Sequence, residues 1–263
     1  MRYAAAMRVT LWCLTVAAAG CQCSKSEAAF DAGPSGPVPT AAIQAGVDAA
    51  LAKRQQGDSL AASTLLLELA AKARAANDVA GEALALHRAG DTLLDRHECG
   101  PSRKRYLEAL ALHRQGNDRI KLGLVANDLG LWSKHCQLEE AVGWFSLAMS
   151  YRRGDDGAFG VSANNLGAVF WNINRPEEAN LAYQEALVAA ERASDPVLQR
   201  KVLANLALLW VLIAEGHYDF DPLAENAPID ALLESDAGVD DLLRALDART
   251  SRFDHDDTEP RPI

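Results

Sequence analysis

The sequence predicts an all-α protein, and three observations carry this prediction. Apolar residues make up 49% of the 263-residue chain, and most of them are Ala and Leu, which favour helix. Aromatic residues make up only 6%, and β-branched runs of strand length are scarce. Similar segments recur about every 40 residues, which is enough chain for two helices and their turns. We therefore expect a repeated array of helix pairs.

The first twenty residues have the features of a targeting segment. Arg2 and Arg8 accompany a short apolar run, residues 9–19, whereas a transmembrane helix needs about 20 apolar residues. Small residues end the run, as in a secretory signal, and Cys21 follows them directly. This arrangement resembles a bacterial lipoprotein signal, in which the cysteine after the cleavage site is acylated. We expect residues 1–20 to be the signal peptide and Cys21 to be the lipidation site. An ordinary secretory signal is the alternative.

The lipoprotein resemblance also implies a location. Acyl chains on Cys21, palmitate among them, would hold the mature protein on a membrane, because several chains give stable attachment. Gln22 rather than Asp follows the cysteine, which by similarity to enteric lipoproteins favours the periplasmic face of the outer membrane. Residues 21–40 are rich in Pro and Gly and have few large apolar side chains, so we expect a disordered tether.

The central part of the chain repeats a pattern of small and aromatic residues. The small residues are Gly90, Gly130, Gly167 and Ala207, spaced 40, 37 and 40 apart. The first three are followed by an aromatic and a small residue: Tyr106 and Ala109, Phe145 and Ala148, Tyr183 and Ala186. A fainter copy surrounds Ala50. Bulky residues three or four positions from small ones share a helix face, so each unit is expected to be two packed helices.

Proline positions agree with this division into helices. Between residues 41 and 195 the chain has only Pro101 and Pro176, and both fall where a second helix would begin. The first turn of a helix tolerates Pro because its N–H has no partner within the helix. Pro196 falls between two units.

The unit around Gly167 is the most regular. Small and aromatic residues stand at its signature positions: Gly167, Phe170, Ala179, Tyr183 and Ala186. In these residues the chain resembles the tetratricopeptide repeat, and its long units and Asn-Asn-Leu-Gly motif are similar to the kinesin-light-chain type. The resemblance covers residues 43–212 and implies a right-handed α-solenoid of about five helix pairs over residues 41–248. A generic α-helical bundle is the alternative.

The chain departs from the repeat pattern after residue 213. Residues 215–228 contain Pro222 and four acidic side chains, and a second helix is expected to resume at 229–233 or 239–248. The net charge of −10 belongs mainly to this region, because residues 215–263 carry 14 acidic and 4 basic side chains. We expect residues 249–263 to form a disordered acidic tail. The acidity also argues against nucleic acid as a partner.

The repeat resemblance implies a concave groove, lined by the first helices, that binds a peptide or a partner helix. Counting from the Leu-Gly motif gives four candidate groove residues: Asn127, Lys134, Asn164 and Trp171. The two carboxamides could bond a peptide backbone, or they could bridge adjacent helices internally. The paired basic and Asn pattern that chaperone-binding members use for a terminal carboxylate is lacking, so a chaperone co-factor role is disfavoured.

Catalytic motifs are lacking. The sequence has no Gly-rich phosphate loop, no His-Glu-x-x-His and no Gly-x-Ser-x-Gly. The carboxylate pairs Glu139/Glu140 and Glu177/Glu178 fall at expected helix starts, where negative charge favours the helix dipole. We expect a non-enzymatic protein with no cofactor and no bound metal.

Two cysteines, Cys99 and Cys136, fall in the turns of consecutive units and would meet at one edge of the array. A disulfide there suits an oxidising periplasm. His97 and His135 flank the same turns, so a zinc site is also conceivable, and two free packed thiols are the third possibility.

These expectations favour a lipid-anchored adaptor or scaffold that binds an envelope or periplasmic protein, with a pilotin-like or complex-assembly role. The alternative is a redox- or metal-responsive sensor module built on Cys99, Cys136, His97 and His135.

Overall fold

The structure is a computed structural model that describes residues 37–216. This part of the chain contains nine α-helices, one short 3-10 helix and no strand. The helices are α2 (Ala41–Gln55), α3 (Ser59–Ala75), α4 (Val79–Asp95), α5 (Cys99–Gln115), α6 (Arg119–Cys136), η1 (Leu138–Glu140), α7 (Ala141–Tyr151), α8 (Asp156–Asn172), α9 (Pro176–Arg192) and α10 (Pro196–Ala214). The predicted all-α class is confirmed.

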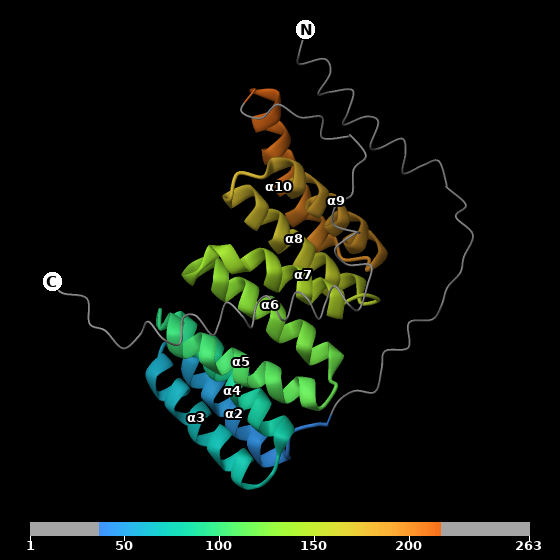
Figure 1. Cartoon of the computed structure of the whole chain (residues 1–263). Helices are drawn as coiled ribbons and strands as arrows, with labels where there is room; N and C mark the ends of the chain where they lie inside the picture. Colours follow the sequence, from blue (N-terminus) through green and yellow to red (C-terminus); the bar gives the residue numbers. More distant parts are fainter. Residues whose placement is uncertain (1–36, 217–263) are drawn as a thin grey trace, which may run out of the picture.

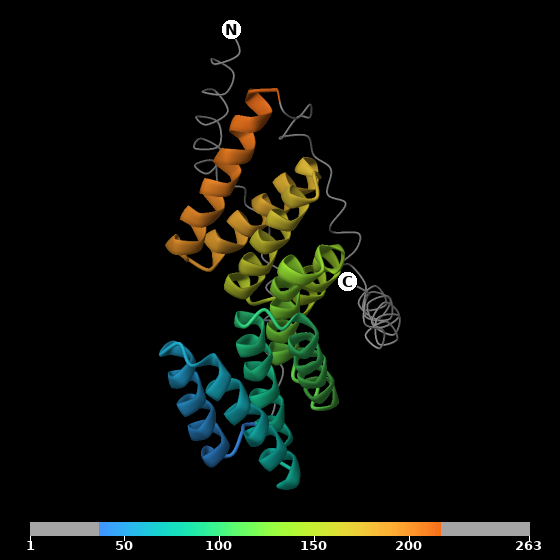
Figure 2. The same ribbon diagram turned by 90° about the vertical axis from the view of Figure 1, so that its left-hand side faces the viewer.

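The helices stack in sequence order from one end of the molecule to the other (Figure 1). Each second helix, α3, α5, α7 or α9, packs against the first helix of its own unit and against the first helix of the next unit. The first helices α2, α4, α6, α8 and α10 also contact one another along the array (Figure 2). This arrangement is the all-α solenoid that the repeat pattern predicts.

The same turn recurs between most helices. A residue with positive φ precedes the next helix by two positions: Gly57, Asn77, His97, Asn117, Gly154, Asn174 and Ser194. An N-cap residue follows it, and in five turns that residue is an Asp whose carboxylate accepts a backbone N–H of the first helical turn. Local turn chemistry therefore sets where most helices begin.

Close contact between a glycine and an aromatic ring joins the two helices in three of the pairs, α4 with α5, α6 with α7 and α8 with α9. A Cβ added to Gly90, Gly130 or Gly167 would lie 2.6 to 2.7 Å from the ring of Tyr106, Phe145 or Tyr183 respectively. All three rings are buried. The absence of a side chain lets the second helix approach closely enough for its ring to fill the space.

Several predictions concern residues outside the described part of the chain. They are the signal peptide, the lipidation site Cys21, most of the tether, the second helix expected at 229–233 or 239–248, and the acidic tail.

Candidate protein-interaction surface

Side chains one and four positions after the repeated small residue form a stripe along the first helices. They are Asp91 and Leu94, Leu131 and Lys134, Ala168 and Trp171, and Leu208 and Val211. All eight are partly or fully exposed, although the residues around them in α4, α6 and α8 are mostly buried. We call this stripe the inner face, because its positions belong to the first helices, which contact one another along the array.

Lys134 and Trp171 lie on the inner face, on consecutive first helices α6 and α8. Burial lowers the pKa of Lys134, and the positive charge of Lys201 on α10 lowers it further. Within residues 37–216 the ammonium of Lys134 has neither a hydrogen bond nor an ion pair. Trp171 is partly buried and packs against the core of the C-terminal units. The inner face therefore offers a cation without a partner and an aromatic surface.

Asn127 and Asn164 do not lie on the open part of this face, because both are buried between helices. In each of these units, the residue three positions before the small residue forms a hydrogen bond with a residue of the next unit. That partner lies two positions before the small residue of its own unit. Three such contacts form a polar ladder: His87 Nε2 to Asp128 at 2.7 Å, Asn165 to Asn127 at 3.5 Å, and Asn205 to Asn164 at 2.8 Å. Asn127 and Asn164 thus have the internal bridging role that the sequence left open.

The ladder is most highly charged around His87. Asp91 accepts hydrogen bonds from Tyr106 Oη at 2.9 Å and from Arg88 at 3.0 Å. Burial raises the pKa of Tyr106, and the charge of Asp91 raises it further, so the phenol stays protonated and donates.

The imidazole and carboxylate atoms of His87, Asp91 and Asp128 lie within 4.8 Å of one another, close enough to share a cation. The carboxylates already have partners, however: Asp91 pairs with Arg88 and Tyr106, and Asp128 pairs with His87. These contacts account for the cluster as a structural network between α4, α5 and α6.

The second candidate site is the edge where Cys99 and Cys136 meet. The two sulfur atoms form a disulfide with a Cα–Cα distance of 5.9 Å, which joins the start of α5 to the end of α6. Because both sulfurs are in the bond, they offer no thiolate pair to a metal. His97 and His135 are exposed beside the disulfide.

A buried ion pair supports the disulfide edge. Arg103 donates to both carboxylate oxygens of Glu140, at 2.8 and 2.9 Å, and its guanidinium lies 5.3 Å from the ring centre of Trp132. Trp132 Nε1 donates to the carbonyl of Cys99 at 2.8 Å. This group cannot be recognised in the sequence, because its members come from α5, α6 and η1 and show no common motif.

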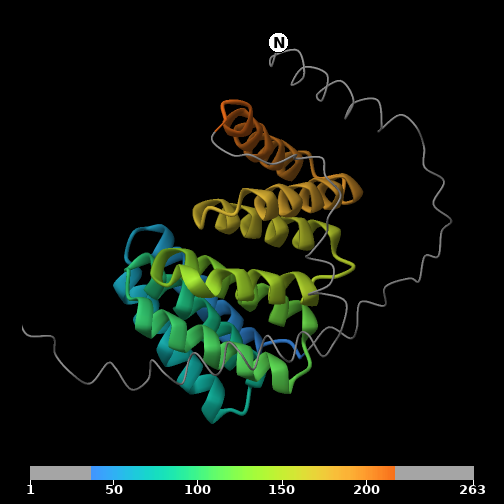
Figure 3. The same cartoon turned by 45° about the horizontal axis from the view of Figure 1, so that its top comes forward.

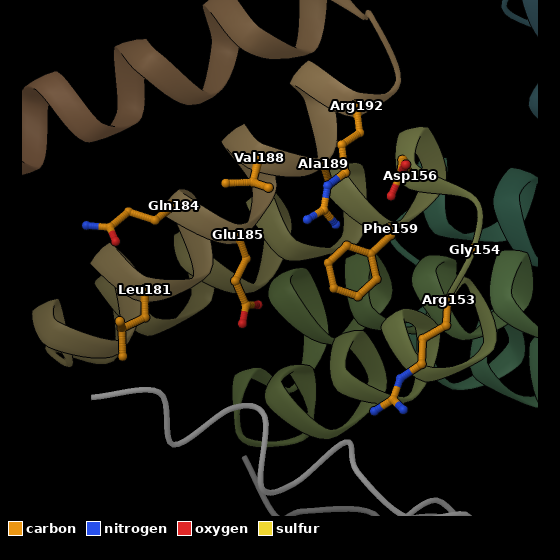
Figure 4. Close-up of a pocket in the computed structure, with 10 residues that line it drawn as sticks. All are labelled: Arg153, Gly154, Asp156, Phe159, Leu181, Gln184, Glu185, Val188, Ala189 and Arg192. Carbon is orange, nitrogen blue, oxygen red and sulfur yellow. The ribbon is translucent and has the colours of Figure 1, made fainter. Parts of the chain in front are cut away.

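An open hollow lies at the start of α8 and along α9, where Phe159, Leu181, Glu185 and Arg192 line it (Figure 4). The sequence gives no signal for it, because its lining residues come from different helices and match no known pattern.

The stacked helix pairs, the repeated glycine–aromatic contacts and the inner face define a helical-repeat protein. No protein-family model matches the sequence, and no curated protein matches it either. The chain is similar to the crystal structure of BtubC (BKLC) from P. vanneervenii. The likeness has a TM-score of 0.56 at 17% identity and covers 85% of this chain and 93% of that one. At this identity the likeness supports the fold alone.

Proposed function

We propose that this protein is a tetratricopeptide-type adaptor that binds a segment of another envelope protein on its inner face. The observation that carries the proposal is that Trp171 and Lys134 both lie on this partly exposed stripe, and that Lys134 has no hydrogen bond or ion pair within residues 37–216. An aromatic side chain supplies a large contact area at low entropic cost, and a free ammonium can donate hydrogen bonds to a carboxylate or carbonyl oxygen of the ligand. The BtubC-like helical fold is compatible with this use.

The anchoring part of the proposal comes from the sequence alone. Cys21, followed by a Pro- and Gly-rich tether, would hold the array at a distance from the outer membrane, where it could reach a periplasmic partner. Replacement of Cys21 by Ser should move the protein from the membrane fraction to the soluble fraction and abolish labelling by a fatty acid. Retention of membrane attachment in that variant would contradict a lipid anchor.

The inner face can be tested with a photo-crosslinking amino acid in place of Ala168, in cells that express the full-length protein. We expect a defined crosslinked partner from this position. The matched control is the same amino acid at Val188 of α9, which is 45% exposed but lies on a second helix. Crosslinks of equal yield at both positions, or none at Ala168, would contradict the proposal.

A substitution then measures the contribution of the aromatic contact. Replacement of Trp171 by Ala should weaken partner binding by about 10- to 100-fold, the usual range for a central aromatic contact. Val188→Ala should leave binding unchanged.

The disulfide favours a second candidate function, a redox-responsive module. The Cys99–Cys136 bond ties neighbouring units together, so its reduction could change the spacing of Leu94 and Leu131 on the inner face. In this alternative, partner affinity falls on reduction of the natural protein and is insensitive to reductant in Cys99→Ser/Cys136→Ser. If reductant leaves the affinity of the natural protein unchanged, the disulfide is purely structural. Elemental analysis of the purified protein tests the metal-responsive form of this alternative.

A further inference from the structure

One face of each of the first helices α2, α4, α6 and α8 packs against the second helix of its own unit. In α6, a Cβ added to Gly123 would lie 3.2 Å from Tyr151 Cβ on α7, and one added to Gly130 would touch Phe145. In α8, a Cβ added to Gly160 would lie 3.2 Å from Ala189 Cβ on α9 and 3.0 Å from Leu198 on α10. This face therefore includes the repeated small residue itself and the residues four and seven positions before it.

The same face of α10 is open. Arg200, Leu203 and Ala207 occupy these positions, and all three are exposed. Leu203 is 49% exposed, whereas its equivalents Leu86, Ala126 and Ala163 are at most 2% exposed. Figure 3 shows α10 as the last described helix of the stack, with other described helices on one side only. We call Arg200, Leu203 and Ala207 the uncovered face.

We propose that residues 239–248 of this same chain dock on the uncovered face as the second helix of the fifth unit. Val239, Leu242, Leu243 and Leu246 are spaced so that they would share one side of a helix. The buried residues of α9 have the same spacing: Ala179, Ala182, Tyr183 and Ala186. Asp240, Asp241, Arg244 and Asp247 would fall on the opposite side, which is typical of a helix with one buried face.

Ala207 supports this choice of segment. Three of the other units have glycine at this position, where a Cβ would lie within 2.7 Å of the facing aromatic ring, and the first unit has Ala50. With a methyl group already present, the face of α10 cannot accept an aromatic residue at the same closeness. Residues 229–248 contain no Phe, Tyr or Trp, so their Leu and Ala side chains suit the methyl group.

The chain after α10 is long enough to return along this helix, and it leaves α10 through a left-handed residue as the chain does after earlier helices. Gly216 has φ 81°, as the left-handed Gly57 has φ 87° in the turn that leads directly into α3. A further 47 residues follow Gly216, from 217 to 263. The connection 217–238 can extend by roughly 70 Å, more than the length of α10, so an antiparallel return is possible. The inference concerns closure of the array and does not depend on the proposed partner.

The experiment uses purified, soluble protein of residues 21–263 in which Ser replaces Cys21. A photo-crosslinking amino acid takes the place of Leu203. We expect an intramolecular crosslink that peptide mass spectrometry maps to 239–248. The matched control places the same amino acid at Val188, from which no crosslink to this segment is expected. Crosslinks from Leu203 that join two copies, or that map elsewhere in the chain, overturn the proposal, as does the absence of any crosslink to 239–248.

Hydrogen exchange gives a second measurement that does not depend on crosslinking chemistry. Leu242→Asp/Leu243→Asp should speed exchange of the α10 amides by about 10-fold or more, because charged residues cannot cover Leu203. Asp240→Asn/Asp241→Asn, which changes the opposite side of the segment, should leave exchange unchanged. Equal exchange of α10 in the natural chain and in Leu242→Asp/Leu243→Asp would overturn the proposal even if the array remains folded.

Discussion

His87 Nε2 lies 2.7 Å from Asp128 Oδ2, and this contact joins the first helices of two neighbouring units. His87 is only 2% exposed, so the contact is shielded from water on the histidine side. The other two rungs of the polar ladder join neutral carboxamides. The ladder thus combines one rung that contains a carboxylate with two that are uncharged.

The charged rung should contribute more to stability than a neutral one. In a double-mutant cycle with His87→Ala and Asp128→Ala, we expect a coupling energy of about 1.5–3 kcal/mol, because hydrogen bonds to charged groups exceed neutral ones. The cycle with Asn164→Ala and Asn205→Ala should give about 0.5–1.5 kcal/mol. Urea unfolding measures both, and equal coupling energies would contradict the assignment.

Loss of the disulfide should destabilise the array. Cys99 and Cys136 are separated by 37 residues, for which loop-closure entropy predicts a stabilisation of about 4 kcal/mol. Cys99→Ser/Cys136→Ser should therefore lower the free energy of unfolding by about 2–4 kcal/mol, as measured in urea without reductant. Reductant should lower the stability of the natural protein to a similar extent and leave the double variant unaffected. If reductant leaves the urea unfolding curve of the natural protein unchanged, the disulfide does not contribute to the free energy of unfolding.

Addition of a methyl group at a glycine–aromatic contact should be costly. In Gly167→Ala the new Cβ would lie 2.6 Å from the buried Tyr183 ring, so we expect a loss of about 1–3 kcal/mol from overpacking. Gly100→Ala is the matched control, because no atom lies within 4 Å of the position its Cβ would occupy. That control should be neutral or slightly stabilising, since Ala favours helix more than Gly. Tyr183→Leu should restore part of the stability of Gly167→Ala, and thermal unfolding compares the set.

Stability should fall in mild acid because of His113. Burial of this side chain lowers its pKa from 6.5 to about 4, and the nearby Asp118 offsets the effect only in part. Between these two values the unfolded chain binds a proton that the folded chain does not, so the free energy of unfolding falls as the pH drops from about 6.5 to about 4. The loss attributable to this group is at most about 3 kcal/mol. His113→Gln should flatten the pH profile in this window. Profiles of equal slope for the natural protein and His113→Gln would contradict this origin.

The sequence predicts the helix pairs well because their signal is local. Gly90, Gly130 and Gly167 mark the helix contacts directly, since close approach requires a missing side chain. The shorter spacing of 37 between Gly130 and Gly167 has a local cause as well: α7 has 11 residues, and the short helix η1 replaces the usual left-handed turn before it.

The polar ladder was harder to predict because its contacts depend on the register between units. His87, Asn127 and Asn164 each precede the small residue by three positions, so the pattern was visible in the sequence. Whether these side chains point toward a ligand or toward the next helix depends on the angle between adjacent units, which a single sequence does not encode locally. The pairing of Arg103 with Glu140 was missed for the same reason.

The Cys99–Cys136 bond also has a mechanical consequence. If the array is pulled from its two ends, non-covalent contacts between units can separate one after another, but the chain between the two cysteines cannot lengthen. At about 3.4 Å per residue, the 37-residue separation withholds roughly 120 Å of contour length from extension. Under load the molecule would behave as two extensible segments on either side of a fixed link, and reduction would release that length in a single step.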